Sequence, residues 1–178
     1  MNPIVHGEIG WLCGHRLKKK RDRFLVALSG IFPDIDGLGI LISDELYELW
    51  HHRLTHGLAG GIFVLVATTH ISRNKTVGLL SLAAYHLHLL CDLVGSGPGW
   101  PMWYFWPFSD VEWMWSWQWD LASWQNSLIG LFMTLACLGC ARRWGRTPVE
   151  LFSQKADTKV VQAIQNRFGV LPPRTKPE

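Results

Sequence analysis

A histidine and an aspartate four residues apart, His88 and Asp92, stand inside an otherwise apolar run of this chain. Residues four positions apart lie on the same face of an α-helix, so the imidazole and the carboxylate point the same way. Ionisable groups in an apolar helix are costly unless they are paired or bound to a metal. The pair therefore predicts a site in which both side chains bind one ion.

Further candidate ligands precede this pair. A histidine lies in the first apolar stretch, two aspartates follow Pro33, and three histidines lie close together; they are His6, Asp34, Asp36, His51, His52 and His56. Imidazole with carboxylate suits zinc, manganese or iron, and three or four protein ligands with an open position mark a catalytic site. The alternatives are local: His6 makes a hydrogen bond nearby, and the aspartates cap a turn or the next helix.

Composition indicates which elements must position these residues. The chain has 178 residues, 48% of them hydrophobic and 17% charged, whereas an average soluble domain has about 25% charged residues. Four runs of low charge reach the roughly 20 residues that a bilayer requires. They are Phe24–Ser43, Leu54–Ser72, Thr76–Gly97 and Leu121–Ala141. The mean hydropathy of +0.10 also fits a soluble all-helical protein with buried helices.

We expect an all-α fold, a small helical bundle of about four membrane-embedded helices with an aromatic-rich loop and a C-terminal soluble helix. The expected domains are a membrane-embedded domain over 1–146 and a cytoplasmic amphipathic tail over 147–178. The tail has its apolar positions on one side of a helix, at Val160, Val161, Ile164 and Phe168.

The charges of the connections predict an orientation. The connections Lys18–Arg23, Arg73–Lys75 and Arg142 onward are basic, whereas Asp44–Arg53 and Ser96–Asp120 are poor in Lys and Arg. Such alternation follows the positive-inside rule, which places the basic connections in the cytoplasm. The candidate ligands then gather at the non-cytoplasmic side.

Eight of the eleven tryptophans lie between Gly99 and Trp124. Indole prefers the headgroup level of a bilayer, so this segment predicts an aromatic collar on the outer leaflet. The alternation of Trp113, Trp115, Trp117 and Trp119 has the period of a strand, which would place the four rings on one face. Core packing around a soluble site is the alternative.

Four motifs in the first 110 residues or so carry a resemblance to a known family. They are His6 with Gly10, the PDxD of Asp34 and Asp36, the HHRxTH of His51–His56, and the HxxxD of His88 and Asp92 with a glycine-rich turn and WPFS after it. In this order they resemble the membrane-bound, metal-dependent hydrolases known as LexA-regulated or YdjM-like. That family is similar in turn to the bacterial zinc phospholipases C, which are all-helical enzymes.

The resemblance implies an integral protein of the bacterial inner membrane and a set of ligands: His6, Asp36 or Asp34, His56 or His51, and His88 with Asp92. The HHRLTH run is more compact than the family's form, which leaves the register between His51 and His52 open. The phospholipases also have a His-x-x-x-Glu pair, which has no counterpart after Asp92. One or two ions are therefore expected, zinc first.

The expected activity is metal-assisted hydrolysis of a phosphoester in a lipid or lipid-linked substrate. A bound ion lowers the pKa of water from about 16 toward about 7 and neutralises charge on phosphate oxygens. Asp34 or Asp36 would take the proton from that water. Arg53 would bind a phosphate oxygen, or it anchors a helix end at the interface. The resulting metal set is His6, Asp34, Asp36, His51, His56, His88 and Asp92, and the catalytic set is Asp34 and Arg53.

Two other classes of function fit the same residues. Histidines in helical spans, His70 with His86 or His88, would hold haem in an electron-transfer module. Alternatively the chain is a stress-response or adaptor protein of the membrane, with a structural metal and no catalysis. Nucleic acid is not an expected partner, because the basic clusters are short and fit the topology better. The oligomeric state is not indicated.

Overall fold

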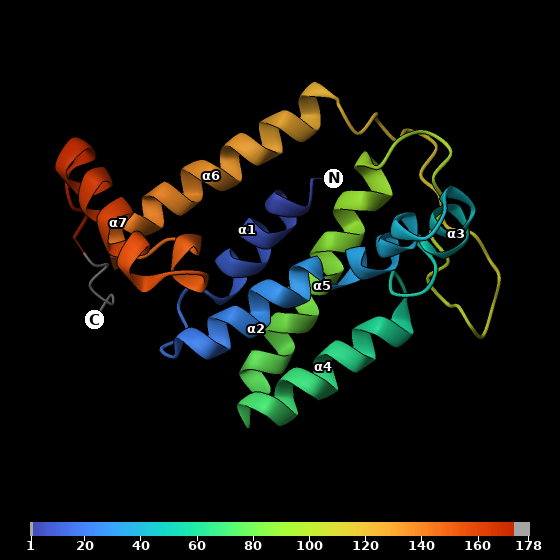
Figure 1. The fold of residues 1–178 in the computed structure, drawn as a ribbon, viewed down its shortest axis with the longest axis horizontal. Coiled ribbons are helices and arrows are strands. Elements are labelled where there is room, and N and C mark those ends of the chain that lie inside the picture. Colours follow the sequence, from blue (N-terminus) through green and yellow to red (C-terminus); the bar gives the residue numbers. More distant parts are fainter. Residues whose placement is uncertain (1, 173–178) are drawn as a thin grey trace, which may run out of the picture. The chain divides into compact units, whose positions relative to one another are not determined.

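The computed structural model describes residues 2–172, and these form helices and loops without a strand. Figure 1 shows the order of the helices. They are α1 (Pro3–Gly14), α2 (Lys20–Ile31), the 3₁₀-helix η1 (Phe32–Leu41), α3 (Asp44–Trp50), α4 (Leu58–Ser72), α5 (Lys75–Gly95), α6 (Trp124–Trp144), the 3₁₀-helix η2 (Pro148–Leu151) and α7 (Gln154–Phe168). The predicted all-α fold is confirmed.

The chain divides into two compact units, Met1–Gly130 and Leu131–Glu178, and α6 crosses from one to the other. The first is called unit 1 and the second unit 2. The predicted domain boundary after residue 146 stays a prediction, and the last residues of the predicted tail, 173–178, lie outside the described residues.

Glycines let α1 and α2 pack closely in unit 1. A Cβ on Gly30 would lie 2.8 Å from the carbonyl oxygen of His6 and 3.0 Å from Cα of Gly10. A Cβ on Gly10 would lie 2.9 Å from the carbonyl oxygen of Ala27. No side chain fits between the two backbones at these positions. The glycines therefore let the start of α1 lie directly against the end of α2.

Helix α5 packs against α1, α2 and α4 and contributes residues to two hydrophobic cores of unit 1. One core joins Val64, Tyr85, Leu89 and Met102, and the other joins Val26, Val77 and Ala84. Arg73 in the left-handed conformation and the N-cap Asn74 connect α4 to α5 by a tight turn. The polar residues His88 and Asp92 lie on the C-terminal half of α5, a helix that also contacts η1.

The aromatic segment between α5 and α6 is held by polar contacts to the end of α5. Gln118 donates hydrogen bonds to the carbonyls of Leu93 and Trp100, and Asn126 donates to the carbonyl of Gly95. Met102 and Trp113 form an isolated antiparallel bridge. The strand predicted from the tryptophan alternation is wrong for the described residues, because side-chain hydrogen bonds and turns, not a ladder, hold the segment.

Unit 2 contains the second half of α6, η2 and α7. Its core joins Ala141 with Val161 and Ile164 of α7. Phe168, predicted on the same apolar face, is exposed. The carboxylate of Asp157 is buried and accepts hydrogen bonds from the backbone and the hydroxyl of Thr147, which fixes the start of η2.

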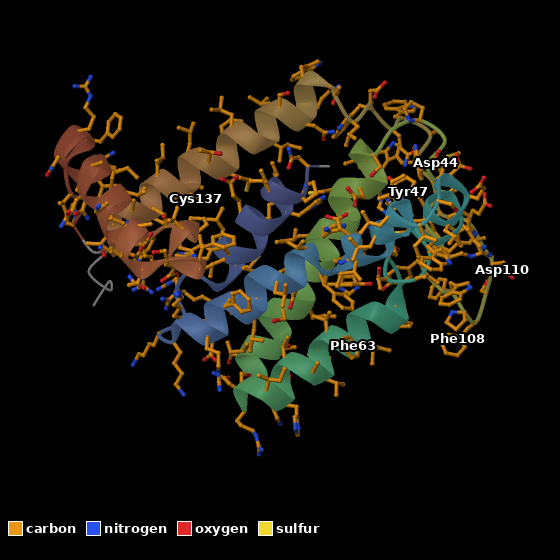
Figure 2. All side chains as sticks on the ribbon, viewed as in Figure 1. Asp44, Tyr47, Phe63, Phe108, Asp110 and Cys137 are labelled. Atoms are coloured by element: carbon orange, nitrogen blue, oxygen red, sulfur yellow. The ribbon has the colours of Figure 1, made fainter. Side chains whose placement is uncertain are left out.

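Within residues 2–172, three helical segments are long and apolar enough to cross a membrane: Lys20–Leu41, Lys75–Gly95 and Trp124–Trp144. Leu58–Ser72 is a shorter apolar helix. Aliphatic and aromatic side chains of these helices are exposed, among them Phe63 of α4 (Figure 2). Exposed apolar faces on such helices fit contact with lipid.

Candidate metal centre

The 3₁₀ geometry of η1 sends its two aspartates in different directions. A 3₁₀-helix has three residues per turn, so every third residue lies on the same ridge. Pro33, Asp36 and Gly39 form the buried ridge, and Asp34 and Gly37 form a second ridge that lines a cavity. The carboxylate of Asp34 therefore faces the cavity, whereas that of Asp36 faces the histidines after α3.

Asp36 holds these histidines by hydrogen bonds. Its two carboxylate oxygens accept from Nδ1 of His51 and Nδ1 of His56, both at 2.9 Å. The backbone N–H of Thr55 donates to the same carboxylate at 3.2 Å. A carboxylate that binds Nδ1 fixes the tautomer of a histidine and leaves Nε2 as the ligand atom.

The remaining nitrogens converge on Asp92 of α5. Its Oδ2 lies 2.8 Å from Nε2 of His88, 3.5 Å from Nε2 of His56 and 4.0 Å from Nε2 of His52. Its Oδ1 lies 3.2 Å from Nε2 of His6. All five of these side chains are buried.

The close approach of α1 and α2 places His6 and His88 together. Nδ1 of His88 donates to the carbonyl of Gly30 at 2.8 Å, and the rings of His6 and His88 stack with centroids 3.7 Å apart. Gly30 thus positions two histidines. Its carbonyl oxygen accepts a hydrogen bond from His88, and its lack of a side chain lets the backbone of His6 lie close to it.

Two groups of these residues have the geometry of a metal site. Asp34, His56, His88 and Asp92 offer ligand atoms within 4.8 Å of one another, and so do His51, His52 and His56. Zinc ligands at about 2.0–2.3 Å from the ion lie about 3.3–3.8 Å apart in a tetrahedron. Small movements of the side chains would therefore close either group around an ion.

Several polar atoms of the cluster have no hydrogen-bond partner among the described residues. They are Oδ2 of Asp34, Nδ1 of His52 and Nδ1 of His6. Buried polar atoms are normally paired, so unpaired acceptors and imidazole nitrogens in one cluster fit a cation. The donor set of imidazole and carboxylate suits a divalent metal.

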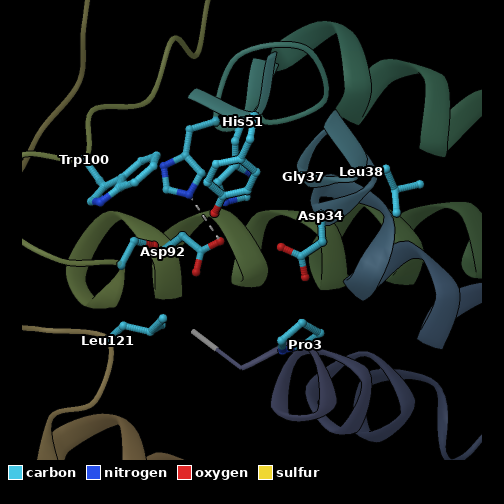
Figure 3. Close-up of a pocket in the computed structure, with 11 residues that line it drawn as sticks. Pro3, Asp34, Gly37, Leu38, His51, Asp92, Trp100 and Leu121 are labelled. Carbon is cyan, nitrogen blue, oxygen red and sulfur yellow. Dashed lines mark ion pairs between the residues drawn. The ribbon is translucent and has the colours of Figure 1, made fainter. Parts of the chain in front are cut away.

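A cavity of about 370 Å³ opens onto the cluster. Figure 3 shows Asp34 and Asp92 facing each other across it, with His51 and Trp100 on one side and Pro3 and Leu121 on the other. The ring of Trp100 lies 5.9 Å from that of His51 and 5.7 Å from that of His52. The arrangement lets a small polar group reach the cluster beside an indole.

Burial shifts the pKa of two cavity-lining groups outside the candidate membrane spans. It lowers the pKa of His52 to about 3, which the charge of His56 reinforces and that of Asp92 opposes. Burial, together with the charges of Asp34, Asp36 and Asp92, raises the pKa of Tyr47 at the cavity wall. Both side chains are therefore neutral near neutral pH, as an imidazole ligand must be.

Arg53, predicted to bind phosphate, is not among the residues that line this cavity. Its guanidinium bonds to the carboxylate of Asp110 at 3.0 Å and lies over the ring of Trp103, with Cζ 5.1 Å from the centroid. In Figure 2, Asp110 is at the outer edge of the aromatic segment. These contacts fit an anchor, the alternative expected for Arg53, and its phosphate-binding role stays a prediction.

The residues of the haem alternative are not arranged around a common centre. His70 is exposed on α4, and His86 has both nitrogens occupied, one by the carbonyl of Leu82 and one by the hydroxyl of Tyr104. His88 belongs to the cluster around Asp92.

Sequence reasoning counted His52 among the candidate ligands but left it out of the final metal set, and it missed the residues of the cavity wall. His52 has a φ of 65°, a left-handed conformation that is uncommon outside glycine. This turn aims His51 at Asp36 and His52 at Asp92, although the two are adjacent in sequence. Tyr47 and Trp100, which no motif marks, line the cavity.

The fold and the site define a helical membrane protein with a buried histidine and carboxylate cluster that could hold a metal. The sequence matches the family described as YdjM inner membrane protein over residues 1–155. The chain belongs to this family, and the predicted resemblance to it and the inner-membrane location are supported. No curated protein and no solved structure matches the chain.

Proposed function

We propose that this protein is a membrane-bound, metal-dependent hydrolase that cleaves a phosphoester bond of a lipid or lipid-linked substrate. The observation that carries the proposal is the convergence of Asp34, His56, His88 and Asp92, from three separate segments, beside a cavity that Asp34 and Asp92 line. One or two divalent ions, zinc first, would be held there. The similarity of the motifs to zinc phospholipases C is part of this proposal.

The roles of the residues follow from their neighbours. His56, His88 and Asp92 would hold the ion, with His6 and His52 beside Asp92, and Asp36 would orient His51 and His56 through their Nδ1 atoms. When bound, zinc supplies a water of lowered pKa and positive charge for phosphate oxygens. Such a site suits an ester with a negatively charged phosphate.

Asp34 is the best placed proton acceptor. Its side chain is partly exposed in the cavity, and its Oδ1 lies 3.6 Å from Nε2 of His88. Its Oδ2 has no hydrogen-bond partner among the described residues. A free carboxylate oxygen beside the ligands can take a proton from a water in the cavity, a contribution of about 10²–10⁴-fold to the rate.

The site faces the non-cytoplasmic side in this proposal. Leu17 packs in the same core as Val77, so the two basic connections of unit 1, residues 15–23 and 73–75, lie at the same end. Figure 1 shows the start of α2 and the turn between α4 and α5 away from α3. Among residues 2–130, Arg53 is the one Lys or Arg outside these connections. The positive-inside rule then places the basic end in the cytoplasm.

Hydrolysis of bis(p-nitrophenyl) phosphate by the purified, zinc-loaded protein tests the proposal. We expect turnover that a chelator removes and that added zinc restores. Asp34→Asn should retain bound zinc and lose about 10²-fold or more in turnover, since it keeps the ligands His56, His88 and Asp92 but removes the base.

The outcomes separate the alternatives. Turnover that is indifferent to the chelator and to Asp34→Asn contradicts a metal-dependent hydrolase. Bound zinc without turnover of phosphodiesters or of phospholipid vesicles, together with unfolding on chelation, would indicate the structural-metal alternative.

A further inference from the structure

The third ridge of η1 is an unbroken apolar track. Ile35, Leu38 and Leu41 follow each other at intervals of three residues and are 47%, 56% and 78% exposed. With three residues per turn they lie in line, and a rise of about 2.0 Å per residue makes the track about 12 Å long. A 3₁₀-helix of this length is uncommon.

Leu38 joins this track to the cavity. It lines the cavity together with the other exposed apolar residues Pro3 and Leu121 (Figure 3), whereas the lining residues Asp34 and Asp92 are half-buried and buried. No Lys or Arg is among the lining residues. The cavity therefore has a polar interior that suits a headgroup and an apolar, uncharged mouth that suits hydrocarbon.

The track lies on a segment that fits a membrane. It occupies the second half of Lys20–Leu41, one of the stretches long and apolar enough to span a bilayer. Exposed aliphatic side chains on such a segment contact lipid chains rather than water. A molecule lying along the track is thus in the hydrocarbon layer while one end reaches the cavity.

We propose that the substrate is a membrane lipid that enters sideways from the bilayer, with an acyl chain along Ile35, Leu38 and Leu41 and its headgroup past Leu38 into the cavity. The proposal rests on the proposed function in that the headgroup would carry the phosphoester. A cavity of about 370 Å³ is at the small end of ligand pockets, which suits a headgroup whose chains remain outside. A site that holds the headgroup in the cavity and the acyl chain along the track is specific for an amphiphile.

Photolabelling of the protein in nanodiscs tests the route without any need for turnover. The probe is phosphatidylglycerol with a diazirine near the ester end of one acyl chain, and labelled residues are located by mass spectrometry. We expect labels on Tyr47 or Trp100, which line the cavity. The reference is Trp117, an exposed residue of the aromatic segment that does not line it.

Leu38→Gln should lower labelling of the cavity residues about tenfold, because it puts an amide at the mouth in place of an apolar contact. Ile40→Gln is the matched control, since Ile40 lies on η1, is similarly exposed and does not line the cavity. Leu38→Met, which keeps an apolar side chain, should retain the label. Cavity labelling no higher than that of Trp117, or an equal effect of Leu38→Gln and Ile40→Gln, would overturn the proposal.

Hydrolysis of bis(p-nitrophenyl) phosphate by the wild-type protein separates this proposal from the proposed function. Cavity labelling without hydrolysis under any metal loading supports the lipid route and counts against the hydrolase. Hydrolysis without cavity labelling counts against the lipid route and leaves the hydrolase standing.

Discussion

The Nε2 atoms of His56 and His88 lie 3.2 Å apart, although 32 positions separate the two residues in sequence. Each ring is fixed by its other nitrogen, His56 by Asp36 and His88 by the carbonyl of Gly30. An imidazole that donates from Nδ1 presents a lone pair at Nε2. Two lone pairs aimed at one another repel, so the pair is stable with a proton or a metal ion between the nitrogens.

Removal of His88 should remove the metal. His88→Ala deletes a nitrogen 2.8 Å from Asp92 and 3.2 Å from His56, so we expect bound zinc to fall by more than about tenfold. His86→Ala is the control and should keep its zinc. His86 lies on the same helix, and among the described hydrogen bonds it has no contact to Asp92. Elemental analysis of the purified proteins measures both, and equal zinc in the two variants would contradict the assignment.

Asp36→Asn should weaken metal binding without abolishing it. Asp36 orients His51 and His56 but lies in neither group of candidate ligands. Loss of a carboxylate that orients a ligating histidine costs about 10–100-fold in affinity. Competition with a chromophoric chelator gives the affinity, with the exposed Asp44→Asn of α3 as control. A loss as complete as that of His88→Ala would make Asp36 itself a ligand.

Gly30→Ala should loosen the contact between α1 and α2. The new methyl would stand 2.8 Å from the carbonyl oxygen of His6, and such overpacking typically costs about 1–3 kcal/mol. We expect a lower thermal midpoint in detergent and less bound zinc, because His6 and His88 both depend on this contact. Gly139→Ala, where a Cβ meets nothing within 4 Å, serves as the control. A midpoint unchanged in Gly30→Ala would count against the close packing.

Acid should destabilise the metal-free protein partly through His52. Its pKa is about 3 in the folded protein and about 6.5 in an unfolded chain, so between these values the unfolded chain binds a proton that the folded one does not. Stability therefore falls as the pH decreases from about 6.5 toward about 3. His52→Asn, which tolerates the left-handed backbone, should flatten this part of the profile of thermal midpoint against pH.

The exposed His70→Gln is the matched substitution for that profile. If the thermal midpoint of His52→Asn falls with decreasing pH as steeply as that of the wild type and of His70→Gln, the acid sensitivity belongs to other groups.

Cysteine labelling should report the orientation. Lys75→Cys lies at the basic end and Asp110→Cys at the end of unit 1 that holds the site, and both positions are exposed. A membrane-impermeant maleimide applied to intact cells should label Asp110→Cys at once and Lys75→Cys only after permeabilisation. The natural cysteines, buried or half-buried, give the background. The reverse pattern would place the site in the cytoplasm.

The long helices could be predicted from the sequence because low charge and length are local properties. Thr76–Gly97 and Leu121–Ala141 correspond closely to α5 and α6. The run Phe24–Ser43 instead contains two helices, since α2 gives way to the 3₁₀-helix η1 one residue before Pro33. The tryptophan alternation gave a wrong strand, because a period of two carries no information on whether a partner strand exists.

Part of the candidate site could be predicted because it, too, depends on residues close together in the sequence. His88 and Asp92 are neighbours on one helix, so their spacing alone brings them together. The different surroundings of Asp34 and Asp36 depend on a turn of about 120° per residue rather than about 100°, which residue types do not reveal. The different directions of His51 and His52 depend on one backbone angle.

The length of η1 is under a constraint that composition alone would not impose. Each residue of a 3₁₀-helix turns by about 120°, so one residue inserted after Pro33 would rotate every later side chain onto the next ridge. The buried ridge, the cavity ridge and the lipid ridge would exchange places, and all three environments would receive the wrong chemistry. Relatives of this chain should therefore accept substitutions along η1 far more readily than any insertion or deletion within it.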